Sequence, residues 1–125
     1  MRVYLAIAIG GVVGCWARYA LGNAVGAIWG REFPYGTMSI NILGSLLIGF
    51  LFIGMTERLA VPEYARIGVV TGMLGGFTTF SSFSLEIMQL IEQDKIGLGL
   101  LYVVLSVGLG LVAAFVGGFG ARLLL

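Results

Sequence analysis

Residues 74–83 read Leu-Gly-Gly-Phe-Thr-Thr-Phe-Ser-Ser-Phe and lie in the middle of an apolar run that is long enough to cross a bilayer. A membrane helix satisfies its backbone hydrogen bonds internally, because lipid offers no partners. Glycines and β-branched threonines in the middle of such a run therefore predict a helix that is broken near residues 75–79. Irregular backbone at that depth is tolerated where it lines a site, so we expect an ion or a substrate there.

The composition indicates an integral membrane protein. Of the 125 residues, 59% are hydrophobic and 10% are charged, whereas soluble domains carry about 25% charged residues. A soluble domain this small leaves much of its surface exposed and cannot hide so many apolar side chains. The net charge of +1 argues against nucleic acid as a partner. The chain has no histidine and no plausible nucleophile–base pair, so we do not expect an enzyme.

Four apolar segments meet the requirement of about 20 residues for a transmembrane helix. We expect helices at residues 3–28, 36–55, 65–90 and 96–121, the third of them broken near 75–79. Pro34 ends helical continuity before the second segment, and Pro62 suits the first turn of the third. Neither an internal repeat nor a long linker is visible, so residues 1–125 are predicted to form one all-α transmembrane domain.

Many of the 21 glycines recur at four-residue steps along the predicted helices. These positions are Gly10, Gly14, Gly22 and Gly26 in the first helix, Gly68, Gly72 and Gly76 in the third, and Gly110, Ala114 and Gly118 in the fourth. Small residues at this spacing let the backbones of membrane helices approach closely. We expect ordinary close packing to account for most of them.

The second helix carries a stripe of neutral polar side chains, Thr37, Asn41 and Ser45. An asparagine in hydrocarbon is costly unless it is paired. Asn41 can therefore make a hydrogen bond to another helix or line a polar path, and the residues around it leave both alternatives open.

Beyond the predicted break, helical spacing places Thr79, Ser82 and Glu86 on one face and Phe80 and Phe83 together on an adjacent face. Phenylalanines in membrane helices usually pack or face lipid. Here they alternate with hydroxyl groups beside a break, and the positive edge of a phenyl ring can contact a small anion.

Two charged residues interrupt apolar segments. Arg18 can reach to an interface or form the positive mouth of an anion path, and Glu86 lies toward the end of its helix, where an interfacial position is plausible. One cation, one acid and many neutral donors favour an anion or a neutral solute over a proton-driven exporter of cations.

The distribution of Lys and Arg specifies orientation weakly. If the chain crosses the membrane four times, one side carries Arg2, Arg58, Arg66 and Arg122, and the other side carries Arg31 and Lys95. A chain with so small a bias can insert both ways. Because four short helices also enclose little volume, we expect an oligomer, with oppositely oriented subunits as one form of it.

Three motifs together are similar to those of one family. They are Gly11-x-x-Gly14-x-x-x-Arg18-Tyr19, Gly36-Thr37-x-x-x-Asn41-x-x-Gly44 and Gly72-x-x-Gly75-Gly76-Phe77-Thr78-Thr79-Phe80-Ser81. On these residues the chain resembles the fluoride channels of the Fluc (CrcB) family over essentially its whole length. The resemblance implies a multi-pass protein of the bacterial inner membrane. It also implies an antiparallel, dual-topology homodimer with two pores that export fluoride passively and so relieve fluoride toxicity.

The resemblance also implies roles for individual residues. The fluoride pore is expected to be lined by Asn41, Phe80, Phe83, Ser81, Ser82, Thr37 and Glu86, with Arg18 in the vestibule. A structural sodium ion is expected at the dimer interface, held by the backbone carbonyls of Gly75 and Thr78. The family usually has threonine at the position of Ser82, where this chain keeps the hydroxyl but not the methyl group.

Two other functions share some of these sequence features with a channel. A small multidrug-type transporter is also a four-helix and often dual-topology dimer, but its chemistry resembles that of one carboxylate deep in the first helix. The first helix here contains Arg18 and no acid. A non-conducting assembly subunit needs only the glycine steps, and it leaves the stripe of Thr37, Asn41 and Ser45 unexplained.

Overall fold

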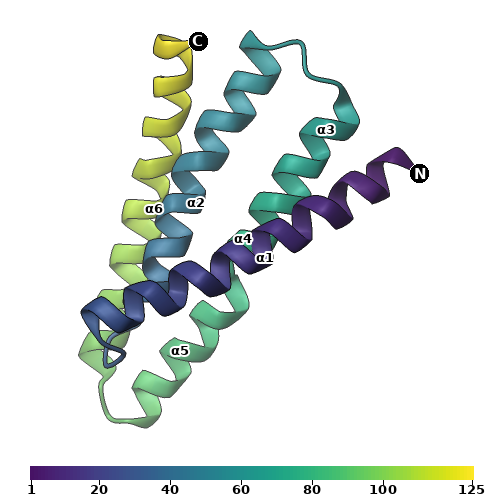
Figure 1. Ribbon diagram of the computed structural model, residues 1–125. Helices are drawn as coiled ribbons and strands as arrows, with labels where there is room; N and C mark the ends of the chain where they lie inside the picture. Colours follow the sequence, from purple (N-terminus) through teal and green to yellow (C-terminus); the bar gives the residue numbers. More distant parts are fainter.

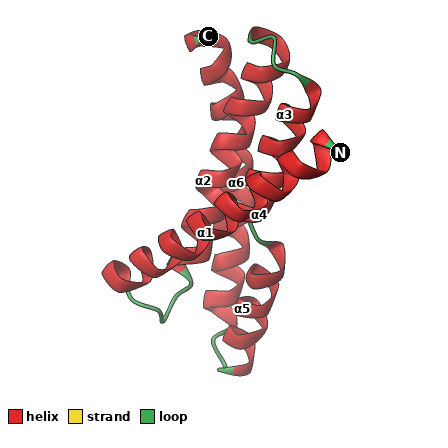
Figure 2. Ribbon diagram, turned by 45° about the vertical axis from the view of Figure 1, so that its right-hand side comes forward, coloured by secondary structure: helices red, strands yellow, loops and turns green.

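The computed structural model describes residues 1–125 and consists of helices joined by short turns (Figures 1 and 2). The long helices are α1 (Arg2–Trp29), α2 (Tyr35–Ile53) and α6 (Ile96–Leu124), and η1 (Gly54–Arg58) prolongs α2. Between them, α3 (Glu63–Ile67), η2 (Gly68–Leu74) and α4 (Gly75–Phe77) form one helical run, and α5 (Phe80–Glu92) follows it. The predicted ranges 3–28, 36–55, 65–90 and 96–121 correspond to α1, α2 with η1, α3 to α5, and α6.

Three helical stretches are long and apolar enough to cross a membrane: Arg2–Trp29, Tyr35–Arg58 and Ile96–Leu124. The predicted third segment is interrupted between α4 and α5, so neither the run from α3 to α4 nor α5 reaches the length of about 20 residues that a crossing requires. The molecule is therefore a multi-pass membrane protein whose third helical segment consists of two shorter pieces.

The helices pack in two arrangements, one side by side and one crossed. In Figure 1, α2 and α6 run side by side along the length of the molecule, while α1 crosses obliquely over the run that contains α3 and α4. α5 continues on the far side of α1, and the turns before α2 and before α6 lie at the same end of the molecule. α1 ends at Gly30, whose φ of 87° belongs to the left-handed region that glycine adopts without strain.

Glycines bring α1 into backbone contact with η2. A Cβ atom at Gly10 would overlap the carbonyl of Gly68, and one at Gly14 would overlap the carbonyl of Met73. Close packing therefore explains the glycine steps on this side. A different pattern holds at Gly22 and Gly26 on α1, where the nearest atoms belong to the side chains of Ile40 and Arg31.

The packing of α2 against α6 follows the same rule at other positions. A Cβ atom at Gly49 would overlap the carbonyl of Ala114, and one at Gly117 would overlap the carbonyl of Leu46. Backbones this close gain dispersion contacts along the whole interface, which is the main source of helix association in lipid.

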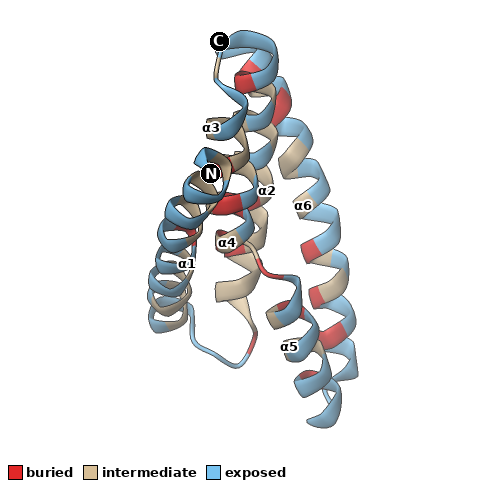
Figure 3. Ribbon diagram, turned by 90° about the vertical axis from the view of Figure 1, so that its right-hand side faces the viewer, coloured by how far each residue is buried: buried red, intermediate tan, exposed pale blue.

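Little of the chain is buried within one copy. Only 19 of the 125 residues are buried, and Figure 3 shows exposed positions along most of α1 and α6. Among the exposed side chains are large apolar ones such as Trp16, at 73%, and Phe115, at 80%. An apolar exterior of this extent matches a bilayer or a second chain as the surroundings.

Candidate functional site at the helix interruption

The interruption consists of Thr78 and Thr79. Thr78 has φ −83° and ψ 158°, and Thr79 has φ −151° and ψ 116°, so both are extended. Gly75–Phe77 is helical, which places the irregular residues after the glycine pair and makes the interruption shorter than the predicted 75–79. Figure 2 shows it as the loop between α4 and α5.

The two threonine hydroxyls close the helix ends on either side. Thr78 Oγ1 donates to the carbonyl of Leu74 at 2.9 Å. Thr79 Oγ1 accepts from the amide of Ser82 at 3.1 Å and so caps the N-terminus of α5. Threonine has a hydroxyl that can hydrogen-bond to backbone groups at a helix end, and glycine has none. The interruption accordingly falls on the Thr-Thr pair.

The side-chain amide of Asn41 on α2 holds the interruption in place. Its Nδ2 donates to the carbonyl of Thr79 at 3.0 Å, and its Oδ1 accepts from the amide of Thr79 at 2.9 Å. These bonds satisfy both backbone groups of Thr79, which would be costly to leave unpaired in lipid. The hydrogen bond between helices, one of the two alternatives for Asn41, is therefore present. A second Nδ2 proton stays available, because an Asn amide carries two.

Two cavities meet at Thr79. The first, of about 580 Å³, we call the polar cavity; its polar lining residues include Arg18, Asn23, Thr37, Ser82 and Glu86. The second, of about 350 Å³, we call the aromatic cavity; it is lined by Asn41, Ser45, Thr78, Phe80, Phe83 and Ser106, among others. Thr79 lines both, so the interruption stands between a polar space and a more apolar one.

Glu86 on α5 is partly buried and makes hydrogen bonds to both α2 and α6. Thr37 on α2 donates to its Oε1 at 2.6 Å, and Tyr102 on α6 donates to its Oε2 at 2.9 Å. Both oxygens of the carboxylate are thus engaged. Ser45, the last residue of the polar stripe on α2, donates to the carbonyl of Asn41 on its own helix at 2.7 Å.

Tyr102 and Ser106 belong to this site and were missed by the sequence analysis. Tyr102 is fully buried, and Ser106 Oγ is buried without a hydrogen-bond partner beside the aromatic cavity. A signal for both exists in the sequence. They are the only polar side chains of α6 before Arg122, and their four-residue separation puts them on one face.

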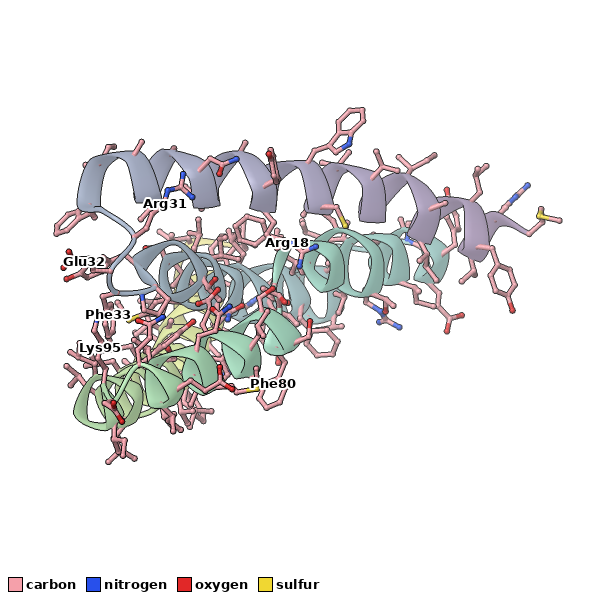
Figure 4. All side chains as sticks on the ribbon, turned by 90° about the horizontal axis from the view of Figure 1, so that it is seen from below. Arg18, Arg31, Glu32, Phe33, Phe80 and Lys95 are labelled. Atoms are coloured by element: carbon pink, nitrogen blue, oxygen red, sulfur yellow. The ribbon has the colours of Figure 1, made fainter.

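Aromatic rings connect the loop before α2 to the interruption. The ring of Phe83 meets that of Tyr102 edge-on, with centroids 5.0 Å apart and planes at 90°, and Phe33 lies 5.5 Å from Tyr102. The ring of Phe80 lies 5.7 Å from that of Phe83. Phe83 is only 7% exposed, whereas Phe80 is 78% exposed and points away from the bundle (Figure 4).

The remaining predicted residues divide between cavity and exterior. Ser82 and the half-buried Arg18 line the polar cavity, and Arg18 makes no ion pair. The ion pair of the structure is elsewhere, between Arg122 and Glu57 at 2.7 Å. Ser81 lines neither cavity; it is exposed, and its Oγ lies 3.4 Å from Thr79 Oγ1.

The carbonyls of Gly75 and Thr78 have lost their regular helical donors. The amide four residues after Gly75 is that of Thr79, which donates to Asn41 instead. The amide four residues after Thr78 is that of Ser82, which donates to Thr79 Oγ1. Both residues line the aromatic cavity. Backbone carbonyls freed in this way are ligands that hard cations accept.

The fold and the site together define a class: a multi-pass helical membrane protein with a polar and an aromatic cavity on either side of an interrupted helix. The sequence model of the family described as "CrcB-like protein, Camphor Resistance (CrcB)" matches residues 5–118. The chain therefore belongs to the CrcB family.

Curated relatives agree over nearly the whole chain. A protein of Magnetococcus marinus is 48% identical over 94% of this chain and 96% of its own length. Relatives in a Roseiflexus species and in Geobacter sulfurreducens are 44% and 43% identical, over 96% and 98% of this chain and 97% and 98% of their own lengths. All three are named "Fluoride-specific ion channel FluC".

Proposed function

We propose that this protein is a fluoride-selective ion channel that lets fluoride leave the cell passively across the bacterial inner membrane. Relatives of this name align with nearly the whole chain. The observation that carries the proposal is the meeting of the two cavities at Thr79, among amide, hydroxyl and phenyl groups. A proton-coupled transporter of cations is not supported, because α1 has no acid and both oxygens of Glu86 are engaged.

The chemical task of such a pore is to replace the water that fluoride holds strongly. The free Nδ2 proton of Asn41, the hydroxyls near the interruption and the ring edges of Phe80 and Phe83 are uncharged partners of the required kind. Several weak sites in series allow the ion to leave again, whereas one strong site would trap it. We assign this pore lining to Asn41, Phe80, Phe83, Ser81, Ser82, Thr37 and Glu86.

Arg18 supplies positive charge without a partner at the polar cavity. An unpaired cation in a recess raises the local concentration of anions. We therefore assign Arg18 to the vestibule, where it attracts fluoride before the ion loses its water.

We further infer that two antiparallel copies assemble into the conducting unit. The high exposure of Phe80 beside the open aromatic cavity supports this, since a second copy would enclose both. The freed carbonyls of Gly75 and Thr78 suit a sodium ion, as the donor set consists of hard oxygens. When bound between the copies, sodium would supply positive charge that holds the carbonyl dipoles together.

The deciding experiment is ion efflux from liposomes that contain the purified protein. The liposomes are loaded with potassium fluoride or potassium chloride, and valinomycin lets potassium leave so that the charge of the departing anion is balanced. Each anion is followed with a selective electrode. We expect rapid fluoride efflux and chloride efflux close to that of protein-free liposomes. Equal efflux of the two ions, or none of either, contradicts the proposal.

A further inference from the structure

We propose that a groove beside the loop before α2 binds an anionic phospholipid of the surrounding bilayer, with its phosphate on Arg31 and Lys95. The groove has a volume of about 690 Å³ and lies between this loop, the start of α2 and the first turns of α6. We call it the loop groove. The inference requires that the chain spans a membrane but not that it conducts fluoride.

The wall of the loop groove is apolar. Met38 of α2 faces Leu98, Leu101 and Leu105, which form one stripe along α6. Leu98 and Leu101 remain 40% and 47% exposed, so the protein itself does not cover the wall. A stripe of this kind, running from the end of a helix inward, suits an acyl chain lying along α6.

The rim of the loop groove is cationic. Arg31 comes from the loop and Lys95 precedes the first residue of α6, and neither makes an ion pair within the chain. Glu32 shares this rim, so the rim carries two cations against one acid. Figure 4 shows Glu32, Phe33 and Lys95 at one end of the molecule, with Arg31 at the same end but nearer to α1. Basic pockets between membrane helices are the sites at which anionic headgroups bind.

A glycine that helix packing does not explain makes room for this arginine. The atom nearest to a Cβ built at Gly26 is Cζ of Arg31, at 3.3 Å. The guanidinium of Arg31 thus lies back over the last turns of α1. Since Arg31 also lines the polar cavity, Lys95 is the cation that tests the loop groove most cleanly.

The aromatic residues of the loop groove fix its depth in the membrane. Trp29 and Tyr35 both line it, and their ring centroids are 5.8 Å apart. Tryptophan and tyrosine gather at the level of the lipid headgroups, which puts the cationic rim at the phosphates and the leucine stripe below them. The loop groove shares no lining residue with the aromatic cavity, so a second copy that covers Phe80 need not cover this groove.

The experiment uses Trp29 as the reporter. The chain has two tryptophans, and Trp16→Phe leaves Trp29 alone to be quenched by phospholipids with brominated acyl chains. In mixed vesicles we expect brominated phosphatidylglycerol to quench Trp29 in preference to brominated phosphatidylcholine. Each cation at the rim should contribute about fivefold to that preference. Lys95→Gln should lower it, Lys95→Arg should retain it, and Arg66→Gln, on an element outside the groove, should leave it unchanged.

Three results would overturn the inference. Equal quenching by both lipids would mean that the rim does not select charge, and absence of quenching by either would mean that protein covers the groove. Reversal of the preference by millimolar inorganic phosphate would assign the rim to free phosphate. Fluoride efflux is recorded from the same vesicles: lost lipid preference with normal efflux contradicts this inference alone, and absent efflux contradicts the proposed function alone.

Discussion

Asn41 and Thr79 bind each other twice, through a side-chain amide on one side and both backbone groups on the other, at 3.0 and 2.9 Å. The side chain of Asn41 replaces the helical hydrogen bonds that the amide and the carbonyl of Thr79 would make if the helix were continuous. It also ties α2 to the residue at which the polar and aromatic cavities meet. The structural role of Asn41 and the conducting role proposed for it thus rest on the same side-chain amide.

Replacing Asn41 by aspartate should damage both roles. The carboxylate has no proton to donate to the Thr79 carbonyl, and it places a negative charge in the proposed path of an anion. We expect fluoride efflux to fall by more than tenfold and the folded protein to lose about 1–3 kcal/mol from the unpaired carbonyl. Efflux and thermal unfolding in detergent measure the two effects. Ser39→Ala on the same helix is the control, since Ser39 makes no side-chain hydrogen bond; wild-type efflux in the aspartate variant would place the pore elsewhere.

Phe80→Ile should slow fluoride efflux without destabilising the protein. The ring is 78% exposed, so little packing within one copy is lost, but isoleucine offers no ring edge to an anion. Phe115→Ile on α6 is the matched control, because Phe115 is 80% exposed and lines neither cavity. Efflux is measured in liposomes and assembly by size-exclusion chromatography. Equal slowing in both variants would show a general effect of losing an exposed ring.

The sequence predicted the helices well, because long apolar runs between prolines and charged turns admit few other structures in lipid. It predicted the interruption less well. Glycine weakens a helix, yet Gly75 and Gly76 stay helical, and it is the hydroxyls of Thr78 and Thr79 that offer the backbone another partner. Which carbonyl Asn41 would bind depends on how α2 packs against α4, and that contact joins residues 38 positions apart.

The hydrogen-bond partners of Glu86 could not be predicted from the sequence either, because they lie on other helices. Periodicity puts Glu86 on the face of Ser82, but it says nothing about Thr37 on α2 or Tyr102 on α6. The two phenylalanine rings are a case where the sequence was sufficient: it predicted that Phe80 and Phe83 lie together, and their ring centroids are 5.7 Å apart. That one of them is buried and the other exposed follows only from the position of α6.

Tyr102→Phe should destabilise the protein through Glu86. The variant keeps the ring contact with Phe83 but leaves Oε2 of the carboxylate without its donor. Because hydrogen bonds to charged groups contribute about 1.5–3 kcal/mol, we expect a loss within that range. Thermal unfolding in detergent measures it. Tyr64→Phe, at a 41% exposed tyrosine with no side-chain hydrogen bond, should have no effect, and equal stability of the two variants would remove Tyr102 from the network.

Gly14→Ala should prevent close packing of α1 on η2. The added methyl group would overlap the Met73 carbonyl, which is backbone and cannot move aside. We expect a loss of about 1–3 kcal/mol from overpacking. Gly108→Ala is the matched control, since nothing lies within 4 Å of a Cβ at that position of α6, and alanine there should leave folding unchanged or improve it. The yield of folded protein after extraction and its thermal unfolding separate the two variants.

Removal of sodium should weaken the proposed dimer rather than the single copy. The Gly75 and Thr78 carbonyls have lost their helical donors, so their partial charges stay unbalanced unless a cation or water approaches. In sodium-free buffer with N-methylglucamine, the proposed dimer should dissociate at a protein concentration at which it stays intact in sodium. The protein should also conduct fluoride more slowly. Potassium should restore neither property fully, because it is the larger ion. Native mass spectrometry reports the oligomeric state, and efflux reports conduction. A dimer that is equally stable in both buffers would assign these carbonyls to water and leave the rest of the site intact.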